Sequence, residues 1–358
     1  MSRPDHPLTP GERVCVTGAN GFIGSYVVKA LLAKGFRVRA VVRDPTNAEK
    51  TAHLTALADD LDATERLELG KGDLMVEDSF DEAVADCAAV VHTAAAVVFS
   101  AADPQRDIVD PSLIGTRNVL RSVAKNPSVR RVVHTSSMVA AYGWSQPPDH
   151  VYSEADWNTS STLNNDPYGL AKVEAEKAAR VFVDGLGADQ RFRLVHLNPG
   201  MVWGPPMIKA HAKASPKLVR DMISRSQPGV PHLMLSVVDV RDVADAHVRA
   251  LTHPDPPVRC LILAENHWMP ELMQRIQAMW PDIRMGTRTI PKALVLIAAA
   301  LDKQLSAAQL WHLINRPMTM SNALSIRAYQ MSYLPMDQTL RDTAEPMITN
   351  GWARVESR

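Results

Sequence analysis

Tyr168 and Lys172 are the residues of this chain whose types and spacing most directly suggest chemistry. They stand four positions apart in a segment with alanines at helical spacing, so both side chains lie on one face of a predicted helix. Asp166 and Pro167 suit the start of that helix, which is expected to continue to about Val183. An ammonium group lowers the pKa of a neighbouring phenol, which can then protonate an alkoxide. The pair therefore suits a carbonyl reductase.

The same spacing also arises by chance in many helices, where a half-buried tyrosine lies beside a solvated lysine, so the surrounding sequence must decide. Ser137 lies just after the predicted strand 131–135. The carboxyl ends of the central strands form the crevice in which open α/β sheets bind ligands. A hydroxyl group at that position can form a hydrogen bond with the backbone of a loop, or it can donate a hydrogen bond to a developing oxyanion. Beside the tyrosine and the lysine, we favour the second role.

A glycine-rich turn near the N-terminus predicts a dinucleotide site. The apolar strand 13–17 is followed by glycines at 18, 21 and 24 and then by a helical pattern that stops at Gly35. Strand, glycine turn and helix follow one another in the order that places a pyrophosphate on the free N–H groups of a helix N-terminus. The residues of this turn expected to contact the cofactor are Gly18, Asn20, Gly21, Phe22, Ile23 and Gly24.

The end of the second predicted strand, 37–42, bears on the choice of cofactor. Enzymes that prefer NAD usually place a carboxylate near this point to hold the ribose hydroxyls. Arg43 stands there instead, and a guanidinium group suits the 2′-phosphate of NADP, with Lys50 as a second positive charge. Both cations could also be solvated surface residues, and Asp44 could serve NAD. We favour NADP(H).

Two later strand ends are expected to meet the same cofactor. Asp73 follows the apolar segment 67–69, where its carboxylate can cap a helix or accept a hydrogen bond from an adenine amine. The strand 88–92 continues into the small residues 93–96. Their short side chains admit a cofactor close to the backbone, although they could equally form a tight corner of the core.

The alternation of strands and helices predicts an α/β fold with a doubly wound parallel Rossmann sheet. This alternation fades in the second half, where we expect a helix over 207–232, a strand over 235–240, a helix over 239–251 and a mostly helical remainder. The expected cofactor-binding domain comprises 1–200 and 235–265, and the expected substrate-binding part, smaller and mostly helical, comprises 201–234 and 266–358.

Composition narrows the class of protein. The 358 residues include 39 lysines and arginines and 39 aspartates and glutamates, so nothing suggests a nucleic-acid partner or a basic membrane-binding surface. Cys15, Cys87 and Cys260 lack the spacing of a zinc or redox site and are interpreted as reduced core thiols. The polar N-terminus and the short apolar run 293–301 indicate neither a signal peptide nor a membrane span. A soluble cytoplasmic protein is expected.

Hydrolase and metalloenzyme chemistry find less support. No Gly-x-Ser-x-Gly elbow occurs in the sequence. The twelve histidines are scattered, with no pair at i and i+4, so no metal site is expected. His92 and His134 fall in predicted strands and are interpreted as core or sheet-edge residues.

Taken together, these motifs resemble the extended short-chain dehydrogenase/reductase superfamily. Within it, the chain is most similar to the group of dihydroflavonol reductases, cinnamoyl-CoA reductases and microbial aldehyde and carbonyl reductases. The similar stretches cover the chain nearly from end to end: 16–24, 38–47, 135–137, 168–172, 199–205, 240–244 and 341–345.

The resemblance implies a catalytic triad of Ser137, Tyr168 and Lys172. The contacts that it implies for an NADP(H) cofactor are Arg43 and Lys50 at the 2′-phosphate, Asp73 and Leu74 at the adenine, Thr93, Ala94 and Ala95 along the middle, and Pro199, Val202, Tyr168 and Lys172 at the nicotinamide end. One departure concerns the helix after 110. Many members carry an asparagine three residues before Gly115, where this chain has Ser112, so a proton relay through that asparagine is not carried over.

The expected substrate wall is apolar and consists of Val97, Phe99, Met138, Met201 and Trp203, although such residues often belong simply to a core. The resulting hypothesis is an NADPH-dependent reductase that converts an aldehyde or ketone reversibly to an alcohol. Alternatives are an NAD-dependent hydroxysteroid dehydrogenase, a nucleotide-sugar epimerase or dehydratase, and a non-catalytic nucleotide-sensing protein. The partner is a small molecule, and the protein is a monomer or a homodimer paired through the alanine-rich face 171–179.

Overall fold

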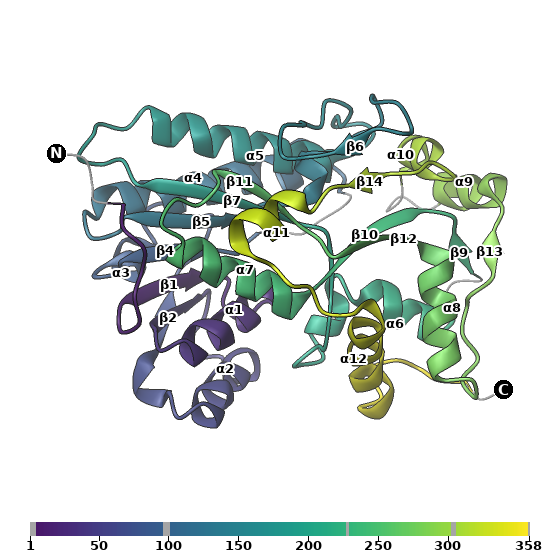
Figure 1. Cartoon of the computed structure of the whole chain (residues 1–358), viewed down its shortest axis with the longest axis horizontal. Coiled ribbons are helices and arrows are strands. Elements are labelled where there is room, and N and C mark those ends of the chain that lie inside the picture. The colour runs from purple at the N-terminus through teal and green to yellow at the C-terminus, as the bar shows by residue number, and fades with distance from the viewer. Residues whose placement is uncertain (1–4, 96–100, 227–228, 302–305, 357–358) are drawn as a thin grey trace.

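The computed structural model describes residues 5–95, 101–226, 229–301 and 306–356 (Figure 1). A seven-stranded sheet with all neighbouring strands parallel forms its centre. The strands are, in spatial order, β11 (Arg259–Ile262), β7 (Arg193–Pro199), β5 (Arg131–Thr135), β4 (Ala89–His92), β1 (Arg13–Thr17), β2 (Arg37–Val42) and β3 (Leu67–Lys71). The order reverses between β1 and β4, which is the switch point at which such sheets bind ligands.

Helices cover both faces of this sheet. In Figure 1, α5 (Pro167–Asp184) lies above the sheet, and α1 (Phe22–Ala33), α2 (Ala48–Asp60) and α7 (Val240–Thr252) lie below it. The short α3 (Asp81–Val84) and α4 (Asp110–Lys125) pack with α5 on the upper side. Successive side chains of a strand point to opposite faces. In β1, Val14 and Val16 therefore join the core between the sheet and the helices α1 and α7. Cys15 points to the other face and joins the core between the sheet and the helices α3 and α4. Burial on both faces is typical of a parallel sheet, and the predicted doubly wound fold is confirmed.

A second sheet of three strands lies beside the first and has its own core. It consists of β12 (Glu265–Trp268), β10 (Met234–Asp239) and β8 (Met201–Trp203), in that order. The helices α6 (Lys217–Ile223), α8 (Met269–Met279) and α12 (Met336–Thr349) pack on it through a cluster that includes Trp203, Met222, Leu272 and Leu340. The strand expected over 235–240 thus belongs to this small sheet and not to the Rossmann sheet.

Three further helices lie in the last part of the chain. The helices are α9 (Lys292–Leu301), α10 (Ala307–Leu313) and α11 (Ala323–Tyr329). Two short parallel pairs hold them in place: β14 (Thr319–Met320) pairs with β6 (Val151–Tyr152), and β13 (Thr289–Ile290) pairs with β9 (Val230–Pro231). In Figure 1, α9 and α10 lie together at the upper right.

Two expectations about helices differ from the structure. The helix expected over 207–232 is wrong, because the described residues of that segment form a single turn at His211–Lys213, the seven-residue α6 and the short strand β9. Pro216 precedes α6 and disfavours helical backbone at the residue before it, which separates the two pieces. The alanine-rich face is also not free to pair two subunits: Ala171, Ala175 and Ala179 are at most 3% exposed within the single chain.

Other expectations agree with the structure. All three cysteines are buried and free. His92 and His134 are buried in β4 and β5, where His92 Nδ1 lies 2.7 Å from the Thr17 hydroxyl. Among the described residues, no helix is both long and apolar enough to span a bilayer.

Candidate active site

A cavity of about 470 Å³ opens where β1, β2 and β4 end, at the switch point of the sheet. The predicted cofactor residues that line it are Gly18, Asn20, Gly21, Phe22, Ile23, Gly24, Arg43, Asp73, Leu74, Thr93, Ala94 and Ala95. The first turn of α1 lies on its wall, and Gly21 caps α1 without a side-chain hydrogen bond. The N–H groups of that turn have no partner within the helix, so they can bind an anion such as a pyrophosphate.

Two glycines of the loop are required by close backbone contacts. Gly18 has φ of +67°, and a Cβ atom there would lie 2.7 Å from the Cα of Ala94. A Cβ atom on Gly24 would overlap the carbonyl oxygen of Gly18 and lie 2.9 Å from the Thr93 hydroxyl oxygen. The glycines therefore let α1, β1 and the end of β4 approach one another, which is the cradle that a dinucleotide requires.

The far end of this cavity carries the residues that bear on cofactor choice. Arg43 is exposed and lines the cavity at the end of β2. Asp44 is engaged in its own turn, because its carboxylate accepts hydrogen bonds from the backbone N–H (3.0 Å) and the hydroxyl (2.7 Å) of Thr46. Lys50 lies in the first turn of α2, is exposed and does not line the cavity, so its contact with a 2′-phosphate stays a prediction.

The wall expected to meet the adenine is held by a residue that no sequence motif identified. Asn118 of α4 donates a hydrogen bond to the carbonyl oxygen of Leu74 at 2.8 Å. Asp73 shapes the same turn by accepting a hydrogen bond from the N–H of Met75 at 2.9 Å. The only sequence signal for Asn118 was a polar residue on the otherwise apolar face of a predicted helix.

A second cavity of about 410 Å³ adjoins the first, and the two share Ile23, Thr93, Ala95 and Ser215 as wall residues. The predicted site residues on its wall are Ser137, Met138, Tyr168, Lys172, Pro199, Met201 and Val202. Volumes of this size hold small organic ligands. A molecule in the second cavity would therefore lie next to one end of a molecule in the first.

The three residues of the predicted triad converge on this second cavity from two elements. Asp166 caps α5 by accepting hydrogen bonds from Gly169 N–H at 3.0 Å and the Ser161 hydroxyl at 2.7 Å. The cap fixes the first turn of α5, where Tyr168 forms a side-chain hydrogen bond with Ser137. The Lys172 ammonium nitrogen lies 5.7 Å from the centre of the Tyr168 ring.

Burial sets the protonation of this group. It raises the pKa of Tyr168 to about 12, and the hydrogen bond with Ser137 offsets only part of that effect. Burial lowers the pKa of Lys172 to about 8, while the Glu176 carboxylate acts to raise it. The direction for Tyr168 is opposite to the sequence expectation, because burial is the largest influence on this phenol and the Asp166 carboxylate adds to it. The phenol therefore remains protonated at neutral pH, which is the form that can donate a proton.

Comparison with known proteins identifies the family of this chain. Residues 14–260 match the model of the NAD dependent epimerase/dehydratase family. The chain belongs to this family. It is the family of the extended short-chain dehydrogenases and reductases that the sequence motifs resemble.

Several relatives that the chain resembles are reductases. Cinnamoyl-CoA reductase CAD2 of Medicago truncatula is 38% identical over 77% of this chain and 83% of its own length. A bifunctional dihydroflavonol 4-reductase/flavanone 4-reductase of Pyrus communis is 31% identical over 77% of this chain and 79% of its own. The structure of yeast methylglyoxal/isovaleraldehyde reductase Gre2 with NADPH superposes with a TM-score of 0.77, at 26% identity, over 95% of this chain and 99% of that one.

Within this family member, a buried carboxylate ties the triad helix to the sheet. Glu176 lies on α5 four residues after Lys172 and is fully buried. Its carboxylate accepts hydrogen bonds from the Ser136 hydroxyl at 2.7 Å and from Asn198 Nδ2 at 2.8 Å. Asn198 Nδ2 also donates to the carbonyl oxygen of Ser137 at 3.0 Å. Glu176 therefore positions the strand ends that carry Ser137, and its spacing from Tyr168 and Lys172 was an overlooked sequence signal.

Arg259 of β11 completes this arrangement. Its Nε lies 2.7 Å from a Glu176 carboxylate oxygen, and its guanidinium carbon lies 4.2 Å from the centre of the Trp157 ring. Burial acts to raise the pKa of Glu176, but His196, Arg259 and the hydrogen bonds of the neighbouring side chains more than offset it, so the pKa is lowered. Glu176 is therefore a carboxylate at neutral pH and can hold the charge of Lys172.

The substrate wall differs in part from the sequence expectation. Met138 and Met201 line the second cavity. The expectation for Trp203 is corrected, because its side chain is 0% exposed and packs in the core of the small sheet. Val97 and Phe99 lie outside the described residues. Further parts of the wall come from 233–235 and 306–318, which no motif in the sequence connects with the triad.

Proposed function

We propose that this family member is an NADPH-dependent reductase that converts an aldehyde or ketone to an alcohol and can run in reverse. The observation that carries the proposal is the contact between the two cavities. The glycine-loop cradle opens at Thr93 and Ala95 into a chamber whose wall bears Ser137, Tyr168 and Lys172. A cofactor in the cradle would therefore present its reactive end to a carbonyl carbon whose oxygen lies beside a protonated phenol.

The chemistry divides between cofactor and protein. The bound NADPH supplies the hydride that reaches the carbonyl carbon. The Tyr168 hydroxyl donates its proton to the carbonyl oxygen, so that hydride and proton together give the alcohol and leave a phenolate. The Ser137 hydroxyl donates a hydrogen bond to the same oxygen as negative charge develops, and a donor placed in this way typically contributes about 3 kcal/mol. Lys172 stabilises the phenolate through its ammonium charge, and Glu176 helps the lysine to keep that charge.

The preference for NADPH rests on the end of β2. Arg43 reaches the cavity wall with a guanidinium group that can bind a phosphate through two parallel hydrogen bonds. Asp44, the residue that could have held the ribose hydroxyls of NAD, is occupied by Thr46. The yeast Gre2 structure is a complex with NADPH, which supports the same choice here.

Tyr168→Phe tests the mechanism. The variant keeps the ring and should bind NADPH with unchanged affinity, as measured by the fluorescence of the bound cofactor. Its turnover of a reactive aldehyde should fall by about 10²- to 10⁴-fold, the usual contribution of a positioned general acid. Unchanged turnover would remove Tyr168 from the reaction.

A panel of aldehydes and ketones with NADPH and with NADH tests the activity class. The absorbance of the reduced cofactor at its characteristic band should decrease with several carbonyl compounds, and faster with NADPH. A preference for NADH with steroid ketones would favour the hydroxysteroid dehydrogenase instead. Tightly bound NAD and conversion of a nucleotide sugar without net oxidation would favour an epimerase.

A further inference from the structure

The second cavity carries one cation that the proposed chemistry leaves unused. Its charged wall residues are Asp166, Lys172 and Arg316. Asp166 is occupied as the cap of α5, where its carboxylate oxygens accept hydrogen bonds from Gly169 and Ser161. Lys172 belongs to the catalytic group. In the described part of the wall, Arg316 therefore remains as a positive charge without a role.

Arg316 differs from the buried arginines of this chain in its partners. Within the described residues, each buried arginine pairs with a carboxylate, as Arg39, Arg130, Arg131 and Arg259 do with Glu68, Glu12, Asp5 and Glu176. Arg316 is half-buried, and no carboxylate of the described residues lies within ion-pair distance of it. Its Nη2 donates a hydrogen bond to the backbone carbonyl of Gln146. A guanidinium group has five N–H donors, so this bond leaves most of them available.

The backbone around Arg316 is held in place from several sides. Asn315 adopts φ of +63°, and its N–H donates to the carbonyl oxygen of His232 at 2.9 Å. Two residues after Arg316, the N–H of Met318 lies 3.2 Å from the sulfur of Met234, and β14 then pairs with β6. On the other side, the His312 ring stacks on Trp144 with 5.4 Å between ring centres. A guanidinium group on so constrained a segment loses little freedom when it binds a ligand.

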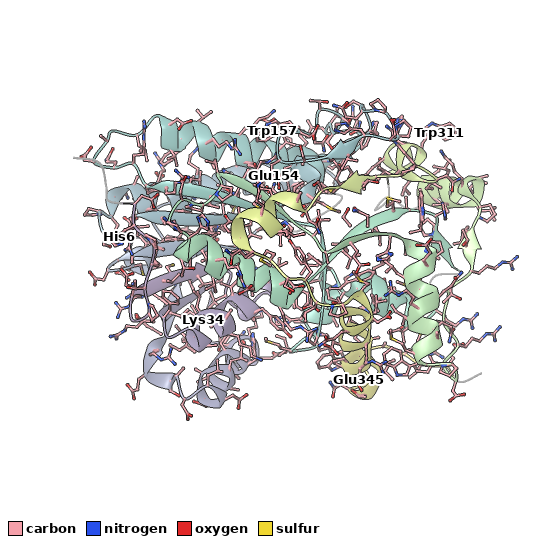
Figure 2. All side chains as sticks on the ribbon, in the orientation of Figure 1. His6, Lys34, Glu154, Trp157, Trp311 and Glu345 are labelled. Carbon is pink, nitrogen blue, oxygen red and sulfur yellow. The ribbon has the colours of Figure 1, made fainter. Side chains whose placement is uncertain are left out.

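Much of the remaining wall is apolar and adaptable, although polar side chains such as Asn165, Ser306 and Gln309 also line it. Four methionines line the cavity, namely Met138, Met201, Met234 and Met318, together with leucines of 233–235 and of α10. Methionine side chains are flexible and polarisable, so they accommodate bodies of different shape. In Figure 2, Trp311 marks the outer side of α10, the helix that contributes leucines to this wall. The cavity thus combines the catalytic group that binds the carbonyl oxygen, a largely apolar wall and the additional cation Arg316.

We propose that Arg316 forms an anion subsite, and that the preferred substrates are aldehydes or ketones whose apolar body carries a carboxylate. This inference rests on the proposed reductase function. A carboxylate fits better than a phosphate, because one guanidinium group matches one carboxylate in charge and can bind it through two parallel hydrogen bonds. The ligand carboxylate would pair with Arg316 in the way that aspartate and glutamate side chains pair with the buried arginines of this chain.

The experiment compares matched acids and esters. The substrates are 4-carboxybenzaldehyde and 5-oxo-5-phenylpentanoate, each with its methyl ester, and 4-formylphenyl phosphate, all with NADPH. The wild-type protein should reduce at least one acid with a kcat/KM about 10- to 100-fold above that of its ester, mainly through KM. This range corresponds to a hydrogen-bonded contact with a charged group. Equal values for both acids and their esters would overturn the inference, and a phosphate preferred to both acids would overturn the choice of carboxylate.

Variants assign the preference to Arg316. Arg316→Gln should bring the ratio of acid to ester close to one, and Arg316→Lys should keep part of it because it keeps the charge but not the planar fork. Arg327→Gln is the matched control, because it removes an exposed arginine from α11 and should leave both substrates unchanged. An unchanged ratio in Arg316→Gln, with normal NADPH affinity and melting temperature, would overturn the inference.

The outcome also separates this inference from the function on which it rests. Reduction of the esters by wild-type protein and its loss in Tyr168→Phe would support the reductase activity alone. With that result, the absence of any preference for an acid would reject the Arg316 subsite and keep the reductase. If no member of the panel is reduced at all, the proposed function fails and the subsite fails with it.

Discussion

The two adjoining cavities share wall residues but are built in different ways. The cofactor cavity comes mainly from the ends of β1, β2, β3 and β4 and the helix after β1, in the first part of the chain, with Ala214 and Ser215 as later wall residues. The substrate cavity combines residues after β5 and β7 with residues of 233–235 and 306–318. The first is defined by backbone that must approach backbone, whereas the second is defined by side chains brought together from distant segments. We therefore expect substitutions in the cofactor cavity to impair function strongly and substitutions in the substrate cavity to impair it little.

The largest effect is expected at Gly24. Gly24→Ala places a Cβ atom against the carbonyl oxygen of Gly18 and should weaken NADPH binding by more than about 100-fold, because backbone must shift on both sides. Titration of cofactor fluorescence measures this. Gly185→Ala at the end of α5 is the control, since its Cβ atom would meet no atom closer than 3.4 Å. Equal affinity of the two variants would contradict the backbone argument.

Glu176 tests whether the two cavities depend on one buried group. Glu176→Gln leaves Arg259 without a charged partner and should lower the free energy of unfolding by about 3–5 kcal/mol, as measured in urea. It should also lower the pKa of Lys172, so that activity declines from a lower pH than in the wild type. Glu174→Gln is the control, because this half-exposed residue has only a 3.8 Å contact with Lys177, and such pairs contribute about 0–1 kcal/mol. An unchanged pH profile in Glu176→Gln would limit Glu176 to a structural role.

Cofactor choice offers a comparison inside the first cavity. Arg43→Glu should reduce kcat/KM with NADPH by about 10- to 100-fold relative to NADH, because a carboxylate repels the 2′-phosphate that the guanidinium group binds. Lys50→Gln should change the ratio much less, since Lys50 does not line the cavity. A larger effect for Lys50 would show that the loop after β2 moves to meet the cofactor.

The pH dependence follows from burial of the triad. The pKa of Lys172 is lowered to about 8, so its charged form is present below that pH and is lost above it. Because the charged form supports the Tyr168 phenolate, kcat/KM for reduction should be level below about pH 8 and fall about tenfold per unit above it. Steady-state kinetics across pH 6 to about 10 measure this. A level profile up to pH 10 would mean that Lys172 stays charged or is not needed.

The smallest effect is expected in the substrate wall. Met234→Leu exchanges side chains of similar volume and should change kcat/KM for an apolar aldehyde by less than about tenfold, because such exchanges usually cost less than about 1.5 kcal/mol. Kinetics with a short and a long aliphatic aldehyde check this. An effect as large as that of Gly24→Ala would remove the contrast between the cavities.

The same contrast explains what the sequence could and could not predict. Gly18 and Arg43 were found because each stands directly at a strand end, and Gly24 because its spacing from Gly18 places it in the first turn of the following helix. Glu176 was overlooked although it continues the spacing of Tyr168 and Lys172, because its partners lie on or just after three different strands: Ser136 after β5, Asn198 on β7 and Arg259 on β11. A sheet aligns such residues only once its strand order is known.

Other features could not be read from local patterns. Trp203 was expected to meet the substrate because it follows β7 closely, yet β8 leaves the main sheet and carries it into a separate core. The segment 207–232 has helical composition, but proline and loop contacts divide it. Arg316 carries no motif, and its position depends on the pairing of β14 with β6. Tertiary contacts, rather than local propensity, decide these cases.

The contact of Arg316 with Gln146 joins positions 170 residues apart, and the β14–β6 pairing joins the same two segments. Contacts so distant in sequence form late, because a long loop must close before they contribute. During synthesis on the ribosome, β1 to β5 emerge long before β14 does. We therefore expect a nascent chain that can already hold its dinucleotide while the chamber that selects the carbonyl compound is still open.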